Sequence, residues 1–163
     1  MPIEIIVHNV SGYLRSRHWV VILKDINVDR YLPIRVGPFE AMAIAIKLKG
    51  VKVRRPFTHD LLKTVINRLG AKVSHILIND LVDNVVYARI IMDAAGRHIE
   101  IDSRPSDAIA LAIGMKVPIL VDEAVMKRAA VTPKPESKKI SAEEKDKLAI
   151  FRDFINSLDL DDL

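Results

Sequence analysis

The chain contains no cysteine, which excludes disulfide bonds, thiolate metal sites and a cysteine nucleophile. Aromatic residues are also scarce, with one tryptophan, three tyrosines and four phenylalanines among 163 residues. The core must therefore be built from aliphatic side chains. No apolar run approaches the roughly 18 residues of a membrane span. The N-terminus, MPIEIIVHNV, lacks the basic and apolar regions of a signal peptide, so we expect a cytoplasmic protein without a membrane partner.

Several well-known catalytic motifs are missing as well. The sequence has no phosphate-binding loop, no glycine-rich dinucleotide motif and no G-x-S-x-G nucleophile motif. What is present is a globular composition, half hydrophobic and 28% charged, with a length that suits one domain. The net charge is +4, and basic residues prevail before residue 132. A basic surface attracts polyanions such as nucleic acid.

Hydrophobic periodicity and turn residues predict the secondary structure. Strands are expected over residues 2–10, 18–26, 31–36, 72–81, 85–93, 97–103 and 117–121. Helices are expected over 38–48, 59–69 and 106–115, followed by a short helix after Asp122. Ser11-Gly12 is expected to form a hairpin turn, and Thr58 to cap the second helix. This pattern predicts an α+β fold, a mostly antiparallel mixed sheet with packed helices in a single compact domain.

We expect the chain to divide into a domain over 1–131, a linker over 132–140 and a C-terminal segment over 141–163. The linker contains the proline-bearing stretch Thr132-Pro133-Lys134-Pro135. Ser141 and Glu144 have the spacing of a capping box, and we expect an amphipathic helix with an acidic tail. Its apolar stripe consists of Leu148, Phe151, Ile155 and Leu158. This stripe needs a partner surface, which is either the same domain or another subunit.

Two segments align when the sequence is shifted by 67 residues, with 34–46 lying over 101–113. Pro38 then matches Pro105, and Glu40 matches Asp107. Alanines at 41, 43 and 45 match those at 108, 110 and 112. Duplication and convergence both explain this match. In either case we expect the two helices to pack closely, because small side chains let helix axes approach. The two acids occupy equivalent first-turn positions, where a carboxylate interacts favourably with the helix dipole.

The stretch IEIDSRPSDAIALAIG, residues 99–114, is the main candidate for a reactive site. Side chains alternate along a strand, so Ile99 and Ile101 are expected in the core. Glu100, Asp102 and Arg104 would then line the opposite face, near Asp107. Carboxylates bind hard cations such as Mg²⁺, and arginine binds phosphate. We therefore predict Glu100, Asp102 and Asp107 as metal ligands and all four polar residues as catalytic. The alternative is a solvated sheet face beside an ordinary helix start.

A second candidate is the basic segment that precedes HDLL. Its predicted nucleic-acid contacts are Lys49, Lys52, Arg54 and Arg55, which would bind phosphate groups. The alternative for this segment is a solvated loop. His59 follows near a helix N-terminus, a good position for binding anions. It is either a general base, and thus a catalytic candidate, or an ordinary helical residue. Few aromatics accompany this segment, so base-stacking platforms are poorly supported.

The stretches LPIRVGPFEAMAIAIKLKGVKVRRPFTHDLL and IEIDSRPSDAIALAI closely resemble the bifunctional nuclease domain family. The resemblance spans roughly residues 2–130. It implies an α+β domain, homo-oligomers with a dimer favoured, and nuclease activity on DNA and RNA. The motif positions carried over to this sequence are Glu40, Thr58, His59, Asp60, Arg104, Ser106 and Asp107.

Two functions follow from these observations. The first is a nuclease that hydrolyses phosphodiester bonds in DNA and RNA, assisted by a divalent cation such as Mg²⁺. The second is a non-catalytic, homo-oligomeric scaffold that binds nucleic acid or has a regulatory role. In the second case the acids near Arg104 serve only the structure.

Overall fold

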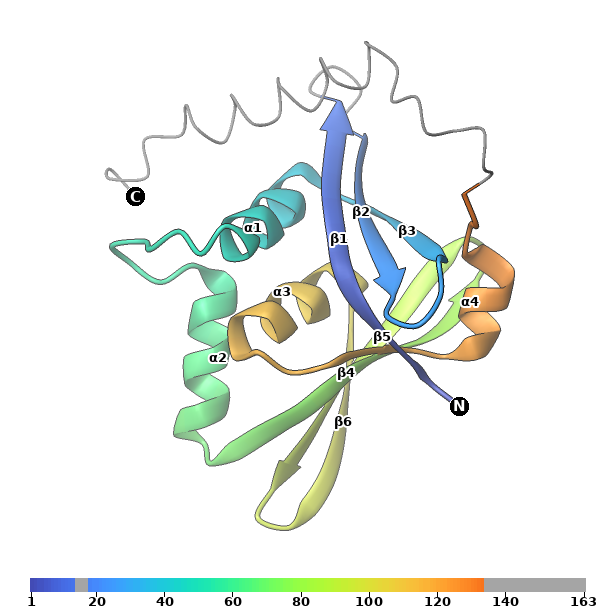
Figure 1. Cartoon of the computed structure of the whole chain (residues 1–163). Coiled ribbons are helices and arrows are strands. Elements are labelled where there is room, and N and C mark those ends of the chain that lie inside the picture. Colours follow the sequence, from blue (N-terminus) through green and yellow to red (C-terminus); the bar gives the residue numbers. More distant parts are fainter. Residues whose placement is uncertain (14–17, 134–163) are drawn as a thin grey trace.

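The structure, a computed structural model, describes residues 1–13 and 18–133 (Figure 1). Seven strands form one sheet of order β3-β2-β1-β7-β4-β5-β6. The strands are β1 (Ile3–Tyr13), β2 (His18–Asp25), β3 (Tyr31–Val36), β4 (Ala71–Val82), β5 (Val85–Ala94), β6 (Arg97–Ser103) and β7 (Ile119–Val121). The helices are α1 (Pro38–Leu48), α2 (Thr58–Arg68), α3 (Pro105–Met115) and α4 (Glu123–Ala129). Only the β4–β7 pairing among these strands is parallel, which confirms the predicted α+β fold with a mostly antiparallel mixed sheet.

The domain consists of two similar halves, β1-β2-β3-α1 and β4-β5-β6-α3. A shift of 67 residues carries α1 (Pro38–Leu48) onto α3 (Pro105–Met115), and each strand of the first half largely overlaps its counterpart. Between the halves, β7 is antiparallel to β1 and parallel to β4. The strands β1 and β4 therefore run in opposite directions, as a two-fold relation between the halves requires.

Helices α1 and α3 are in contact, and in Figure 1 they lie with α2 on one side of the fold. The alanines at their interface are almost fully buried, with Ala41, Ala45, Ala108 and Ala112 at most 4% exposed. This confirms the predicted neighbourhood of the two helices. Because the helix axes approach closely, side chains from the first turn of one helix can reach the first turn of the other.

Two local predictions about turns and caps are wrong. Gly12 lies inside β1, opposite Trp19, and not in a turn. A Cβ at this glycine would lie 2.1 Å from the Trp19 ring, so glycine is needed there for close packing. Thr58 is the first residue of α2 rather than its N-cap, which is Phe57. The Asp60 carboxylate accepts a hydrogen bond from the backbone N–H of Phe57 at 3.0 Å and thus stabilises the helix start.

One core prediction is also wrong. Ile99 packs against the core as expected, whereas the Ile101 side chain is 44% exposed. Strand β6 is one of the two edge strands of the described sheet, and Ile101 lines a groove beside α2. The alternation along the strand is right, but the helices do not cover its last residues.

The C-terminal predictions fall outside the described part of the chain. Residues 134–163 include nearly all of the proposed linker and the whole proposed amphipathic helix, so both stay predictions. The described ranges contain no helix that has both the length and the apolar character needed to cross a bilayer.

Candidate functional site

Three helices begin at one place in the structure. The first turns of α1, α2 and α3 contribute Glu40, His59 and Asp107, and Arg104 is the N-cap residue of α3. All four side chains line one small cavity. The N-terminus of a helix has unpaired N–H groups and a partial positive charge, which favour the binding of anions. Three such ends close together make a suitable environment for a phosphate group.

Arg104 lies between two equivalent acids. Its Nε donates to Asp107 Oδ2 at 2.8 Å, and a terminal nitrogen donates to Asp107 Oδ1 at 3.2 Å. The other terminal nitrogen donates to Glu40 Oε1 at 2.9 Å. Pro105 restricts Arg104 to an extended backbone, with φ −66° and ψ 144°. The Arg104 side chain is still 64% exposed, so a ligand can reach the guanidinium from solvent.

His59 and Asp107 form the second contact of the site. The His59 Nε2 atom lies 2.9 Å from Asp107 Oδ1. Burial raises the pKa of Asp107, but the hydrogen bonds from Arg104 and His59 outweigh this effect and lower that pKa. The carboxylate is therefore ionised and accepts the proton of Nε2. In neutral His59 the lone pair then lies on Nδ1, which has no hydrogen-bond partner within 1–13 and 18–133.

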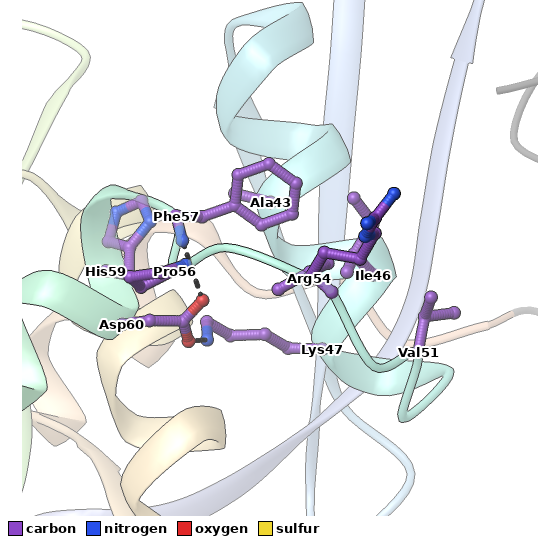
Figure 2. Close-up of a pocket in the computed structure, with 10 residues that line it drawn as sticks. Ala43, Ile46, Lys47, Val51, Arg54, Pro56, Phe57, His59 and Asp60 are labelled. Carbon is purple, nitrogen blue, oxygen red and sulfur yellow. Dashed lines mark hydrogen bonds and ion pairs between the residues drawn. The ribbon is translucent and has the colours of Figure 1, made fainter. Parts of the chain in front are cut away.

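A neighbouring ion pair holds the start of α2 in place. Lys47 of α1 donates to Asp60 Oδ1 at 2.5 Å, and the other Asp60 oxygen holds the backbone of Phe57. Burial raises the pKa of Asp60, but Lys47 and the Phe57 N–H outweigh it and lower that pKa. Figure 2 shows Lys47 reaching Asp60, with the His59 ring on the adjacent residue. Asp60 therefore fixes the first turn of α2, on which the adjacent His59 lies.

His59 lines three cavities of the domain. The largest is a groove of about 830 Å³ between α2 and the β5–β6 edge, and its walls are mainly aliphatic. A second cavity, of about 260 Å³, lies between the starts of α1, α2 and α3. The third, of about 320 Å³, lies beneath the connector that joins α1 to α2 (Figure 2). The imidazole is thus accessible to small molecules although its side chain is only 11% exposed.

The acids predicted from the β6 pattern do not converge. Glu100 contacts Arg89 at 2.6 Å and His98 at 3.0 Å on the sheet surface, and these hydrogen bonds, that of His98 first, lower the pKa of Glu100. Asp102 is exposed at the rim of the groove. Only Asp107 and Arg104 belong to the cluster around His59. The predicted site is therefore divided between the sheet surface and the helix starts.

The predicted cation has no preformed ligand group in the described residues. Within 1–13 and 18–133, no three His, Cys, Asp or Glu side chains are grouped so that they could hold a metal ion. The position between Glu40 and Asp107 is filled by the Arg104 guanidinium. Glu100, Asp102 and Asp107 do not fit a three-carboxylate Mg²⁺ site, and a cation requirement stays a prediction.

The basic residues lie on the connector between α1 and α2. Lys49, Lys52, Arg54 and Arg55 are all exposed. Arg54 lines the same cavity as His59, and Figure 2 shows both on its rim. The predicted phosphate-binding segment therefore lies beside the His59 cluster, which is the arrangement that a common polyanionic ligand requires.

Glu40 and Gly37 were not among the predicted catalytic residues. The 67-residue match identified Glu40 as the counterpart of Asp107, but it could not show that both acids bind one arginine. By the same shift Gly37 is the counterpart of Arg104. A Cβ on Gly37 would lie 2.2 Å from Glu40 Oε2, so the missing side chain leaves room for the Glu40 carboxylate.

We therefore expect Gly37→Ala to displace the Glu40 carboxylate and break its ion pair with Arg104. The backbone at Gly37 has φ −76°, which alanine adopts without strain, so the fold should persist. An exposed ion pair contributes about 0.2–1 kcal/mol, and we expect a loss in this range. Thermal melting of Gly37→Ala, Glu40→Gln and the double variant measures it. If both single variants act by breaking the Glu40–Arg104 ion pair, the double variant should lose no more stability than either one. Additive losses of stability would contradict this.

Comparison with known proteins agrees with these features. The bifunctional nuclease domain family matches residues 21–134, which include both halves of the cluster. An uncharacterized protein of Mycobacterium tuberculosis is 40% identical over 145 residues, covering 88% of this chain and 87% of that protein. Bifunctional nuclease 1 of Oryza sativa subsp. japonica is 28% identical over 85% of this chain and 45% of its own length. Bifunctional nuclease 1 of Arabidopsis thaliana is 27% identical, with 72% and 38% covered. The chain belongs to the bifunctional nuclease domain family.

Proposed function

We propose that this chain is a nuclease that hydrolyses phosphodiester bonds in DNA and RNA at the His59–Asp107–Arg104 cluster. The observation that carries the proposal is the 2.9 Å contact between His59 and an Asp107 carboxylate that Arg104 also holds. An imidazole fixed by an ionised acid beside an exposed guanidinium provides a base and an anion-binding group in one place. The plant relatives named bifunctional nucleases support the same reaction.

The chemistry assigned to each residue follows from its position. A phosphodiester is held by the exposed Arg104 guanidinium and the helix N-termini, which also stabilise the extra negative charge of the transition state. His59 Nδ1 takes a proton from water as the water oxygen bonds to phosphorus and the bond to the leaving oxygen breaks. Asp107 stabilises the resulting imidazolium through Nε2. The leaving oxygen takes its proton from solvent or from His59.

One observation favours the alternative of a non-catalytic scaffold. Glu40 and Asp107 are both engaged in ion pairs with Arg104, and the Arg104–Glu40 pair connects the start of α3 with α1. The same contacts would be expected if the cluster served only to join helices. Binding without cleavage is therefore the outcome that distinguishes the scaffold from the nuclease.

The decisive experiment measures cleavage and binding on the same preparation. Single-stranded and duplex DNA and RNA oligonucleotides are incubated with the purified protein, and a gel-shift assay is run in parallel. We expect cleavage that falls sharply in Arg104→Met, a variant that keeps an unbranched side chain but has no guanidinium. Removal of one such charge-stabilising group lowers rates by about 10²–10³-fold. Binding without cleavage would support the scaffold instead.

A chelator arm of the same assay tests the predicted cation. If a divalent ion such as Mg²⁺ assists cleavage, chelation should abolish it, and Asp102→Asn should have the same effect because Asp102 is an exposed acid on the groove rim. If cleavage persists in chelator, no divalent ion is required, and Arg104 is the group that stabilises the negative charge of the transition state. In both cases, retained cleavage in Asp102→Asn shows that this carboxylate is not needed.

The exposed connector predicts salt-dependent binding of nucleic acid. Each phosphate contact contributes nearly one unit to the slope of log K against log salt for duplex DNA. Replacement of both Arg54 and Arg55 by alanine should therefore weaken binding and lower this slope by up to about two units. Binding isotherms at several salt concentrations measure the slope. Arg97→Ala, at the start of β6, is a control that we expect to keep the wild-type slope.

The oligomeric state belongs to the proposal as well. We expect a homo-oligomer, with a dimer favoured, and sedimentation equilibrium of the full chain tests this expectation.

A further inference from the structure

Phe39 is an exposed aromatic side chain in a protein that has few aromatics. It is 77% exposed, although burial of a phenylalanine side chain contributes about 1.5–3 kcal/mol to folding. It occupies the second position of α1, while the buried residues of this helix begin at Ala41. Packing within the domain therefore does not explain a phenylalanine at this position.

The surroundings of Phe39 connect it to the proposed reaction site. Phe39 lines the cavity of about 260 Å³ that also contains His59, Arg104 and Asp107. The next residue, Glu40, holds the Arg104 guanidinium at 2.9 Å. The aromatic ring and the group that would bind a phosphate are thus parts of one cavity.

We propose that Phe39 is a base-binding residue, on whose ring a nucleobase stacks while the phosphate of the same strand lies at Arg104. The proposal rests on the proposed binding of nucleic acid at this cluster. It departs from the expectation drawn from the sequence, where the scarcity of aromatics argued against a stacking platform. One exposed aromatic ring is enough to stack a nucleobase if the ring lies beside the group that binds the phosphate.

The chemistry of the cavity suits a nucleotide. Its walls combine apolar side chains, Met42, Ile46 and Phe57, with the charged groups of the cluster. A nucleotide has the same two-sided character, because the flat faces of its base are apolar while its phosphate is anionic. Stacking requires only a π-face, so an aromatic platform accepts every base. Phe39 would therefore supply affinity without selecting a sequence, as a nuclease acting on both DNA and RNA requires.

The test uses equilibrium binding of fluorescent single-stranded oligonucleotides to the full-length protein, with His59→Asn as the background if the protein cleaves. Base stacking contributes about 1–3 kcal/mol per base, so Phe39→Leu should weaken binding roughly 5- to 150-fold. Leucine preserves the apolar character and removes the ring, and Phe39→Trp should restore binding. Tyr87→Ala is the matched control, because Tyr87 is an exposed aromatic of β5 outside the three cavities lined by His59.

A series of oligonucleotides, each with one abasic position, shows whether a base is the partner. At the position that contacts Phe39, removal of the base should weaken wild-type binding and make Phe39→Leu equivalent to wild type. Equal affinity of Phe39→Leu and wild type for every oligonucleotide would overturn the proposal. The proposal would also be overturned if Phe39→Leu lost the same affinity, relative to wild type, on every abasic oligonucleotide. Failure of the wild-type protein to bind nucleic acid would overturn it as well.

Three further outcomes separate the base-binding role of Phe39 from a dimer contact and from the nuclease proposal. If Phe39→Leu changes the oligomeric state in sedimentation and leaves affinity unchanged, the ring contacts a second copy of the chain and the proposal is wrong. If the protein binds as expected through Phe39 but does not cleave, the base-binding role stands and the nuclease proposal fails. If Phe39→Leu cleaves normally and binds with unchanged affinity, the nuclease proposal stands and the base-binding role fails.

Discussion

Replacement of His59 by asparagine is expected to lower the rate of nucleic-acid cleavage by about 10²–10⁴-fold, the usual contribution of a positioned acid or base. Asparagine offers no nitrogen lone pair that could accept a proton from water. The side chain at this position is only 11% exposed, and asparagine is smaller than histidine and polar, so it fits there without a clash. The measurement is a single-turnover cleavage assay, accompanied by a thermal melt that shows the fold is retained.

A matched histidine provides the control. His98 also contacts an acid, Glu100, at 3.0 Å, but on the sheet surface and with a side chain that is 65% exposed. We expect His98→Asn to cleave normally. Loss of cleavage in His98→Asn with full activity in His59→Asn would move the reaction site to the Glu100 cluster. Full cleavage by both variants would show that neither imidazole is the base.

A change at the Asp107 carboxylate tests independently whether the His59–Asp107 pair takes part in cleavage. Asp107→Asn keeps the shape of the side chain but removes the charge that stabilises the His59 imidazolium, so cleavage should fall here too. If Asp107 were only a first-turn acid, the change would lower stability by about 0.3–1 kcal/mol and leave cleavage intact. Cleavage rates and melting midpoints measured together distinguish the two roles.

The second large effect concerns stability rather than activity. Asp25, at the end of β2, is 2% exposed and accepts a hydrogen bond from Arg30 at 2.8 Å and another from the backbone N–H of Asn27 at 2.9 Å. Asp25→Ala leaves Arg30 without this partner in a partly buried position. Loss of one partner of a buried pair costs about 3–5 kcal/mol, and we expect a value near 3 kcal/mol because Arg30 retains some solvent contact. Urea unfolding measures it.

The same carboxylate predicts how stability depends on pH. Burial raises the pKa of Asp25, but the Asn27 N–H and Arg30 outweigh this effect and lower that pKa. The ionised form therefore stabilises the fold, fully so above the unfolded pKa of about 3.9, and this contribution is lost as pH falls through the lower folded value. The Asp25→Ala variant should lose less stability than the wild type in this acid range.

Asp29 in the same β2–β3 turn is the control for both measurements. Its side chain is 66% exposed and lies 3.6 Å from Lys24. Exposed pairs contribute little, so Asp29→Ala should cost less than about 1 kcal/mol. If Asp25→Ala and Asp29→Ala were equally mild, the Asp25–Arg30 pair would contribute no more than a surface contact.

The secondary structure could be predicted because its signals are local. Alternating apolar residues marked the strands, and left-handed backbone at Asp83 and Gly96 turns the chain between the strands expected over 72–81, 85–93 and 97–103. Gly12 was mistaken for a turn residue because its true role depends on Trp19, which lies on the neighbouring strand. Thr58 was mistaken for an N-cap because the capping group comes from Asp60. In both cases a contact with another residue decided the outcome.

The site was harder to predict for the same reason. The alternation of side chains along a strand placed Glu100 and Asp102 on one face. It could not show that Glu100 forms an ion pair with Arg89. Arg104 turns away from that face to reach Glu40, which is 64 residues away in the chain. A contact across that distance leaves no trace in local pattern. Two sequence signals pointed to these residues without showing the contact: the 67-residue match, which made Glu40 and Asp107 equivalent, and the family resemblance, which placed Glu40, Arg104 and Asp107 among its motif positions.

The repeated architecture also bears on what charges the site can hold. Glu40 and Asp107 are equivalent by the two-fold relation, and Arg104 binds both, so its guanidinium lies close to the pseudo-symmetry axis. In a dimer of two identical units, every residue at the axis would occur twice, and two guanidinium groups would repel each other there. Because both halves belong to one chain, glycine occupies position 37 and arginine occupies position 104. A fused repeat can therefore keep one cation between two anions, with a single imidazole beside them, which a strictly symmetric assembly could not do.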